Sequence, residues 1–84
     1  MFFLIEYDRG KGKIVSLTTF DNSERLKAQD SRLALELSLH GRGIEREVVL
    51  LDGASEDAVR LTHARYFEDL EQLVSKLKTR LLLT

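Results

Sequence analysis

The segment from Ser55 to Thr84 carries apolar or ring-bearing side chains at helical spacing, and its interpretation governs that of the whole chain. Steps of four and three residues separate Val59, His63, Tyr66, Leu70, Leu73 and Leu77, which is the spacing of one packed helix face. Ser55 suits the N-cap position, and no glycine or proline interrupts the run. The pattern therefore predicts one long helix at the C-terminal end.

Such a helix is too long for the domain that carries it. At 1.5 Å per residue it spans about 45 Å, whereas strands of five to seven residues span roughly 17–24 Å. The projecting half would expose a large apolar patch, and a second copy of the chain is the simplest surface that covers it. We therefore predict a homodimer whose interface contains Tyr66, Leu70, Leu73, Val74, Leu77 and Leu81. In the alternative interpretation, the helix bends or stops near Lys76 and folds back.

The N-terminal part of the chain reads as a β-hairpin. Residues Phe2 to Asp8 are rich in strand-forming side chains, and Lys13 to Phe20 form a second such run. The glycines Gly10 and Gly12 lie in the turn between them, where a positive φ angle is available to a residue without a Cβ atom.

A helix is predicted after the hairpin. Asp21 and Glu24 have the spacing of a capping box, and Gly41 is the expected left-handed stop after His40. The helix carries two apolar rows on nearly opposite sides, one of Leu26, Leu33 and Leu37 and one of Ala28, Leu35 and Leu39. Because one row is enough to rest on a sheet, the other must meet the long helix or another chain.

The run from Glu45 to Asp52 predicts a third strand, with four consecutive apolar residues that indicate burial on both faces. A right-handed crossover places this strand parallel to the second and antiparallel to the first. We therefore predict a single α+β domain over residues 1–84, with ββαβα element order and two layers. The first strand is the most apolar and is placed centrally, which gives the spatial order 2-1-3; the order 1-2-3 is the alternative.

Composition narrows the class of protein without naming a function. The chain has 84 residues, 43% of them hydrophobic and 32% charged, with a net charge of −1 and no cysteine, which is typical of a folded protein in a reducing compartment. The apolar start, Met1 to Ile5, is too short for a signal peptide or a membrane span. We expect a cytoplasmic protein without a membrane partner.

A basic pole offers the alternative function. The predicted topology gathers Arg9, Lys11, Lys13, Arg42 and Arg46 at the hairpin end, where they could contact nucleic acid or another anionic partner. No aromatic residue is interleaved with them to stack on bases, and ordinary matching of charges to helix ends explains several of them.

Catalytic chemistry has little support in the sequence. His63 with Arg60 and Tyr66 could line a small anion pocket, whereas His40 suits the end of a helix. No cluster of ligands has metal-site spacing, and no serine or threonine lies in a nucleophile motif. We therefore expect no cofactor and no metal, and we interpret the chain as an interaction protein rather than an enzyme.

Overall fold

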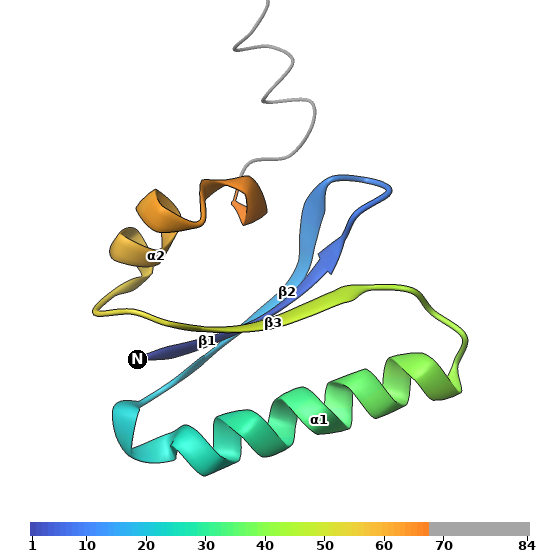
Figure 1. Ribbon diagram of the computed structural model, residues 1–84, viewed down its shortest axis with the longest axis horizontal. Coiled ribbons are helices and arrows are strands. Elements are labelled where there is room, and N and C mark those ends of the chain that lie inside the picture. The colour runs from blue at the N-terminus through green and yellow to red at the C-terminus, as the bar shows by residue number, and fades with distance from the viewer. Residues whose placement is uncertain (68–84) are drawn as a thin grey trace, which may run out of the picture.

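The computed structural model describes residues 1–67, which form an antiparallel sheet with helical segments on its two faces (Figure 1). The predicted α+β class and the ββαβα order are confirmed. The strands and α-helices in chain order are β1 (Phe2–Asp8), β2 (Lys13–Phe20), α1 (Arg25–Gly41), β3 (Glu47–Asp52) and α2 (Glu56–Thr62). Short 3₁₀ turns η1 (Asn22–Glu24) and η2 (Ala64–Tyr66) precede α1 and follow α2.

The sheet has the order β2-β1-β3, and β1 pairs antiparallel with both neighbours. The predicted central position of β1 is confirmed, and the order 1-2-3 is wrong. The β1–β2 ladder shifts register between Glu6 and Tyr7, because Ser16 pairs with Glu6 and Ile14 with Tyr7. Val15 is therefore the extra residue of a bulge in β2, and its side chain is 49% exposed.

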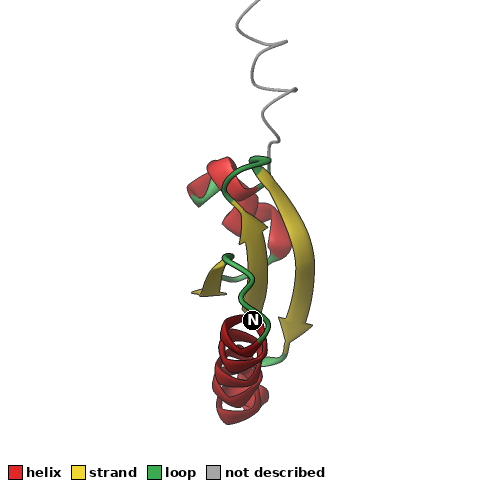
Figure 2. Cartoon of the chain, turned by 90° about the vertical axis from the view of Figure 1, so that its right-hand side faces the viewer, coloured by secondary structure: helices red, strands yellow, loops and turns green. Residues whose placement is uncertain are grey.

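The alternation of side chains along β1 separates two apolar clusters. On the α1 face, Leu4 packs with Phe20 and Ala28, and on the other face Ile5 packs with Tyr7 and Tyr66. Figure 2 shows α1 and the α2 segment at different positions around the sheet. Other segments of the same chain thus cover both faces of β1. This explains why the Ile5 side chain is completely buried.

The predicted start of α1 is confirmed, whereas its end differs from the prediction. The capping box is present, with the Asp21 amide donating to Glu24 Oε1 at 3.0 Å, and it caps the 3₁₀ turn that leads into α1. Gly41 was predicted to be the left-handed stop, but it is the last helical residue. The positive φ angle falls on Gly43, at 66°, because the Arg42 and Gly43 amides still donate to Ser38 and His40 carbonyls.

The second apolar row of α1 faces away from the sheet. Leu26, Leu33 and Leu37 are 75%, 55% and 62% exposed. The row formed by Ala28, Leu35 and Leu39 packs toward the sheet instead, with Ala28 and Leu39 buried. No described residue covers the exposed leucine row (Leu26, Leu33 and Leu37), which the sequence had marked as needing a partner.

The prediction of one continuous C-terminal helix is wrong for the residues that the structure describes. Ser55 is the N-cap, and its Oγ accepts from the Ala58 amide at 3.1 Å, but α2 ends at Thr62 and His63 has φ −128° and ψ 45°. Two interactions accompany this break. Thr62 Oγ1 donates back to the Ala58 carbonyl at 3.1 Å, a bond that weakens a helix end, and Tyr66 packs in the core beside Tyr7. The predicted helix beyond Phe67 lies outside the described residues.

Candidate functional site

The most closely connected polar group in the described part of the chain is centred on Glu47, the first residue of β3. Its side chain is 13% exposed. Arg9 Nε donates to Glu47 Oε2 at 3.2 Å, while Arg65 and the Tyr66 hydroxyl each donate to Oε1 at 2.8 Å. One carboxylate thus joins the hairpin turn, β3 and η2.

Electrostatics hold this carboxylate in its charged form. The hydrogen bond from Arg9 lowers the pKa of Glu47, and the hydrogen bond from Tyr66 and the charge of Arg65 act in the same direction against the opposing effect of burial. Burial raises the pKa of the Tyr66 phenol, and the neighbouring Glu47 carboxylate raises it further. Tyr66 therefore stays a neutral donor and Glu47 an ionised acceptor.

Aromatic contacts complete this Glu47 cluster. The rings of Tyr7 and Tyr66 meet edge to face with centroids 5.1 Å apart, and the Arg65 guanidinium lies 4.3 Å from the centroid of the Tyr66 ring. Tyr66 is 6% exposed. The cluster therefore holds η2 against the sheet, and its role is structural.

A second ion pair lies on the α1 face of the same end. Glu6, in the middle of apolar β1, is 8% exposed and faces Arg46 Nε at 3.3 Å. This distance is within ion-pair range, but the angle does not make a hydrogen bond, and Arg46 Nε has no other partner among the described residues. The pair offsets the burial of a carboxylate that would otherwise be costly.

An open cavity of about 390 Å³ lies between the hairpin turn and the residues before β3. Its lining consists of Asp8, Arg9, Gly10, Glu45, Arg46 and Glu47. Three carboxylates and two guanidinium groups give it no strong preference for ligands of either charge. The two arginines stay protonated near neutral pH, so both guanidinium groups contribute positive charge to the lining.

Carboxylates face two of the five residues of the predicted basic pole. Arg9 and Arg46 face Glu47 and Glu6. Lys11, Lys13 and Arg42 are exposed and form no ion pair within residues 1–67. The Lys11 amide donates to Asp8 Oδ1 at 3.0 Å, and this bond lowers the pKa of Asp8, which keeps a negative charge in the turn.

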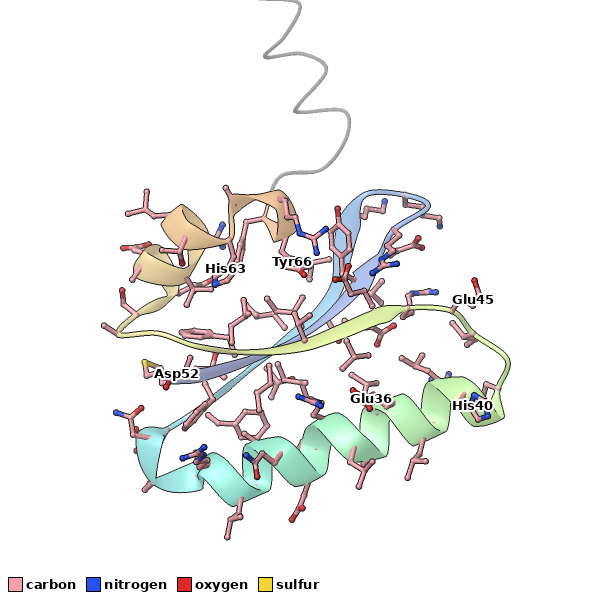
Figure 3. The ribbon with its side chains drawn as sticks, in the orientation of Figure 1. Glu36, His40, Glu45, Asp52, His63 and Tyr66 are labelled. Atoms are coloured by element: carbon pink, nitrogen blue, oxygen red, sulfur yellow. The ribbon has the colours of Figure 1, made fainter. Side chains whose placement is uncertain are left out.

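The residues of the proposed anion pocket do not converge. Arg60 donates to Glu56 at 2.9 Å and lies 4.7 Å from the centroid of the Phe67 ring, while Tyr66 is engaged with Glu47. His63 is half-buried at the end of α2, and its amide donates to the Val59 carbonyl. Figure 3 shows His40 at the far end of α1, well away from His63.

Of the predicted interface residues, Tyr66 alone lies in the part of the chain that the structure describes. Tyr66 is buried within its own chain, so its ring is already used in the core. Leu70, Leu73, Val74, Leu77 and Leu81 lie outside the described residues, and their place in an interface stays a prediction.

Residues 1–67 hold neither a metal-binding group nor a membrane-spanning helix. They contain no group of three or more histidine or acidic side chains that could hold a metal ion. Among the helices of this part, none combines the length and apolarity that a membrane span requires.

Neither Glu6 nor Glu47 was expected from the sequence to organise this end of the sheet. A signal for each was available: Glu6 interrupts a strongly apolar strand, and Glu47 begins another. An acid in such a place is expected to be paired when the strand is buried. Their partners could not be named, because Arg65 and Tyr66 reach Glu47 only where the helix breaks.

Comparison with known proteins adds no relative. No protein-family model, curated protein or solved structure matches this chain.

Proposed function

We propose that this chain is a small interaction protein that self-associates and has no catalytic role. The observation that carries the proposal is the apolar sequence of β3 at an open edge of the sheet. This strand lies at an edge of the sheet, yet Val48, Val49, Leu50 and Leu51 are consecutive apolar residues, each half-buried. A single copy leaves their outer sides without cover from any described residue.

The two edges of the sheet differ in how they are protected. The edge strand β2 begins with the exposed Lys13 and has a bulge at Val15, features that discourage pairing with another chain. Strand β3 has neither a bulge nor a lysine or proline. An unprotected apolar edge is a template for another strand, and a second copy always supplies one.

The exposed leucine row on α1 supports the same class of function. Three large exposed apolar side chains follow one another along the same face of α1. Such a row suits contact with another protein, whereas a single exposed leucine would need no explanation.

The contact proposed from the sequence, through Leu70 to Leu81, falls outside the described residues and stays part of the proposal. Binding of nucleic acid through the basic pole is the weaker proposal, because carboxylates face two of its five cations, Arg9 and Arg46.

Light scattering during size-exclusion chromatography tests the self-association of the full chain. We expect a mass of twice 9.6 kDa at high micromolar concentration, falling toward 9.6 kDa on dilution. Leu61→Gln is the control, since this side chain is 84% exposed on α2 and belongs to none of the proposed contacts, and its replacement should leave the mass unchanged. A folded wild-type chain with the mass of one copy at every concentration would contradict the proposal.

A further inference from the structure

We propose that two copies join through β3 in an antiparallel pair centred on Val49, which creates one sheet of six strands. This inference rests on the proposed self-association and specifies its geometry. Three features of the described residues carry it: the direction of the free backbone groups of β3, the charges at the ends of the strand, and the position of α1.

The pairing of β1 with β3 fixes which backbone groups of β3 point outward. The Gly53 amide donates to the Met1 carbonyl at 3.0 Å, and the Met1 nitrogen donates to the Gly53 carbonyl at 2.9 Å. This reciprocal pair is of the hydrogen-bonded type, and such pairs alternate along an antiparallel ladder. Leu51, Val49 and Glu47 therefore also bond to β1, while Val48, Leu50 and Asp52 direct their N–H and C=O groups to the open edge.

This alternation restricts the registers open to a second copy. A hydrogen-bonded pair needs outward groups on both strands, so Val48, Leu50 and Asp52 must face even-numbered residues of the second copy. The register that would place Glu47 opposite Asp52 pairs an inward residue with an outward one and is excluded. Two central registers remain, with the two-fold axis at Val49 or at Leu50.

Charge decides between the two. With the axis at Val49, Val48 faces Leu50 of the second copy, and Arg46 faces Asp52 at both ends of the joined strands. Either register places an acid opposite an apolar side chain: Glu47 faces Leu51 with the axis at Val49, and Asp52 faces Val48 with the axis at Leu50. Only the Val49 register also places opposite charges, Arg46 and Asp52, directly across the strand pair, which is stabilising, so this register is favoured. The Asp52 side chain is 72% exposed and also lies 3.9 Å from the Met1 amino group. Arg46 faces Glu6 at 3.3 Å within its own chain, so its contact with Asp52 of the second copy would add to that pair.

The helices also fit this arrangement. Residues that face each other across an antiparallel pair point to the same face, so both α1 helices lie on one side of the joined sheet. In each copy, α1 packs mainly over β3 and β1. If its axis lies about half a strand spacing inside β3, the two α1 axes are about 10 Å apart, which is within the range of packed helices. The exposed leucine rows of both copies then lie on one outer surface.

Single cysteine variants test the register directly, because the natural chain contains no cysteine. In the proposed pair Val49 meets Val49 in a non-hydrogen-bonded position, with Cα atoms about 4.5 Å apart, which suits a disulfide. Leu51→Cys is the matched control on the same face of the same strand. Its new side chain would face Glu47 of the second copy, so the two introduced thiols would lie about 13 Å apart along the strands. Thr18→Cys reports on the β2 edge.

The readout is the rate of reductant-reversible dimer formation under mild oxidation on a non-reducing gel, with circular dichroism to show that each reduced variant is folded. We expect Val49→Cys to cross-link at least tenfold faster than Leu51→Cys and Thr18→Cys. Equal rates for Val49→Cys and Leu51→Cys would overturn the register, since an axis at Leu50 places both pairs at the same offset. A faster Thr18→Cys would move the contact to β2 and also overturn the inference.

The wild-type mass distinguishes failure of the contact geometry from failure of self-association. If the wild-type chain is a dimer and Val49→Cys does not cross-link, the geometry proposed for the contact is wrong while self-association stands. If the wild-type chain has the mass of one copy throughout, both proposals fail.

Discussion

Replacing Tyr66 with alanine is expected to lower the free energy of unfolding by about 3–5 kcal/mol, the usual cost of removing a large aromatic side chain from a core. The ring is 6% exposed, packs against Tyr7 and fills the cluster on the sheet face opposite α1. A domain of this size has little stability to spare, so the variant should be largely unfolded or should lose the structure after β3. Urea unfolding followed by circular dichroism measures the effect.

Two companion variants separate the ring from its hydroxyl group. Tyr66→Phe keeps the packing but removes the donor to Glu47, so we expect a smaller loss of about 1 kcal/mol. Leu61→Ala changes an 84% exposed side chain on neighbouring α2 and should cost less than about 0.5 kcal/mol. If Tyr66→Ala is no more destabilising than Leu61→Ala, the contact between η2 and the sheet has been misjudged.

Replacing Glu47 with glutamine is expected to cost about 1.5–3 kcal/mol at neutral pH, because the carboxylate accepts charge-assisted hydrogen bonds from two arginines. The same change should make stability less sensitive to acid. The pKa of Glu47 is lowered in the folded chain from a usual value of 4.5. The stabilisation is therefore complete above about pH 4.5 and is lost as the pH falls through the folded-state pKa.

Unfolding free energies at several pH values between 7 and 3 give the required comparison. We expect the difference between wild type and Glu47→Gln to shrink as the pH falls through the lower part of this range. Glu45→Gln is the matched control, since Glu45 is exposed and has no ion pair among the described residues. A difference between wild type and Glu47→Gln that stays constant down to pH 3 would show that the Glu47 charge contributes nothing.

Much of the fold followed from short-range patterns. The bounds of β1 and β2, the capping box at Asp21 and the N-cap at Ser55 depend on neighbouring residues and were all predicted. The central position of β1 followed from its apolarity on both faces. The helix break at His63 did not, because the spacing from Val59 to Tyr66 is compatible with a helix, and tertiary contacts of Tyr66 override it.

The polar clusters were harder to predict for the same reason. Arg9 and Arg46 were expected in a basic pole that could contact an anionic partner, because position in the sequence does not show which carboxylate each arginine faces. Those pairs join the hairpin turn to β3 and the residue before β3 to β1, and only the folded register brings them together. By contrast, the two apolar rows of α1 were predicted correctly, because helical periodicity alone separates Leu33 from Leu35.

The described domain pairs several of its charged groups internally and leaves apolar surface exposed. At the hairpin end, Glu47 pairs with Arg9 and Arg65, and these contacts hold η2 against the sheet. The exposed leucine row and the open edge of β3 remain available, and both suit contact with another protein surface rather than a small ligand.

Hydrogen exchange followed residue by residue by NMR tests the role of the β3 edge most directly. The Val49 and Leu51 amides bond to β1 and should be protected at all concentrations, whereas the Val48, Leu50 and Asp52 amides point to the open edge. We predict that these three amides are protected at high concentration and exchange rapidly on dilution. Rapid exchange at every concentration, or protection that dilution does not change, would contradict closure of this edge by a second copy.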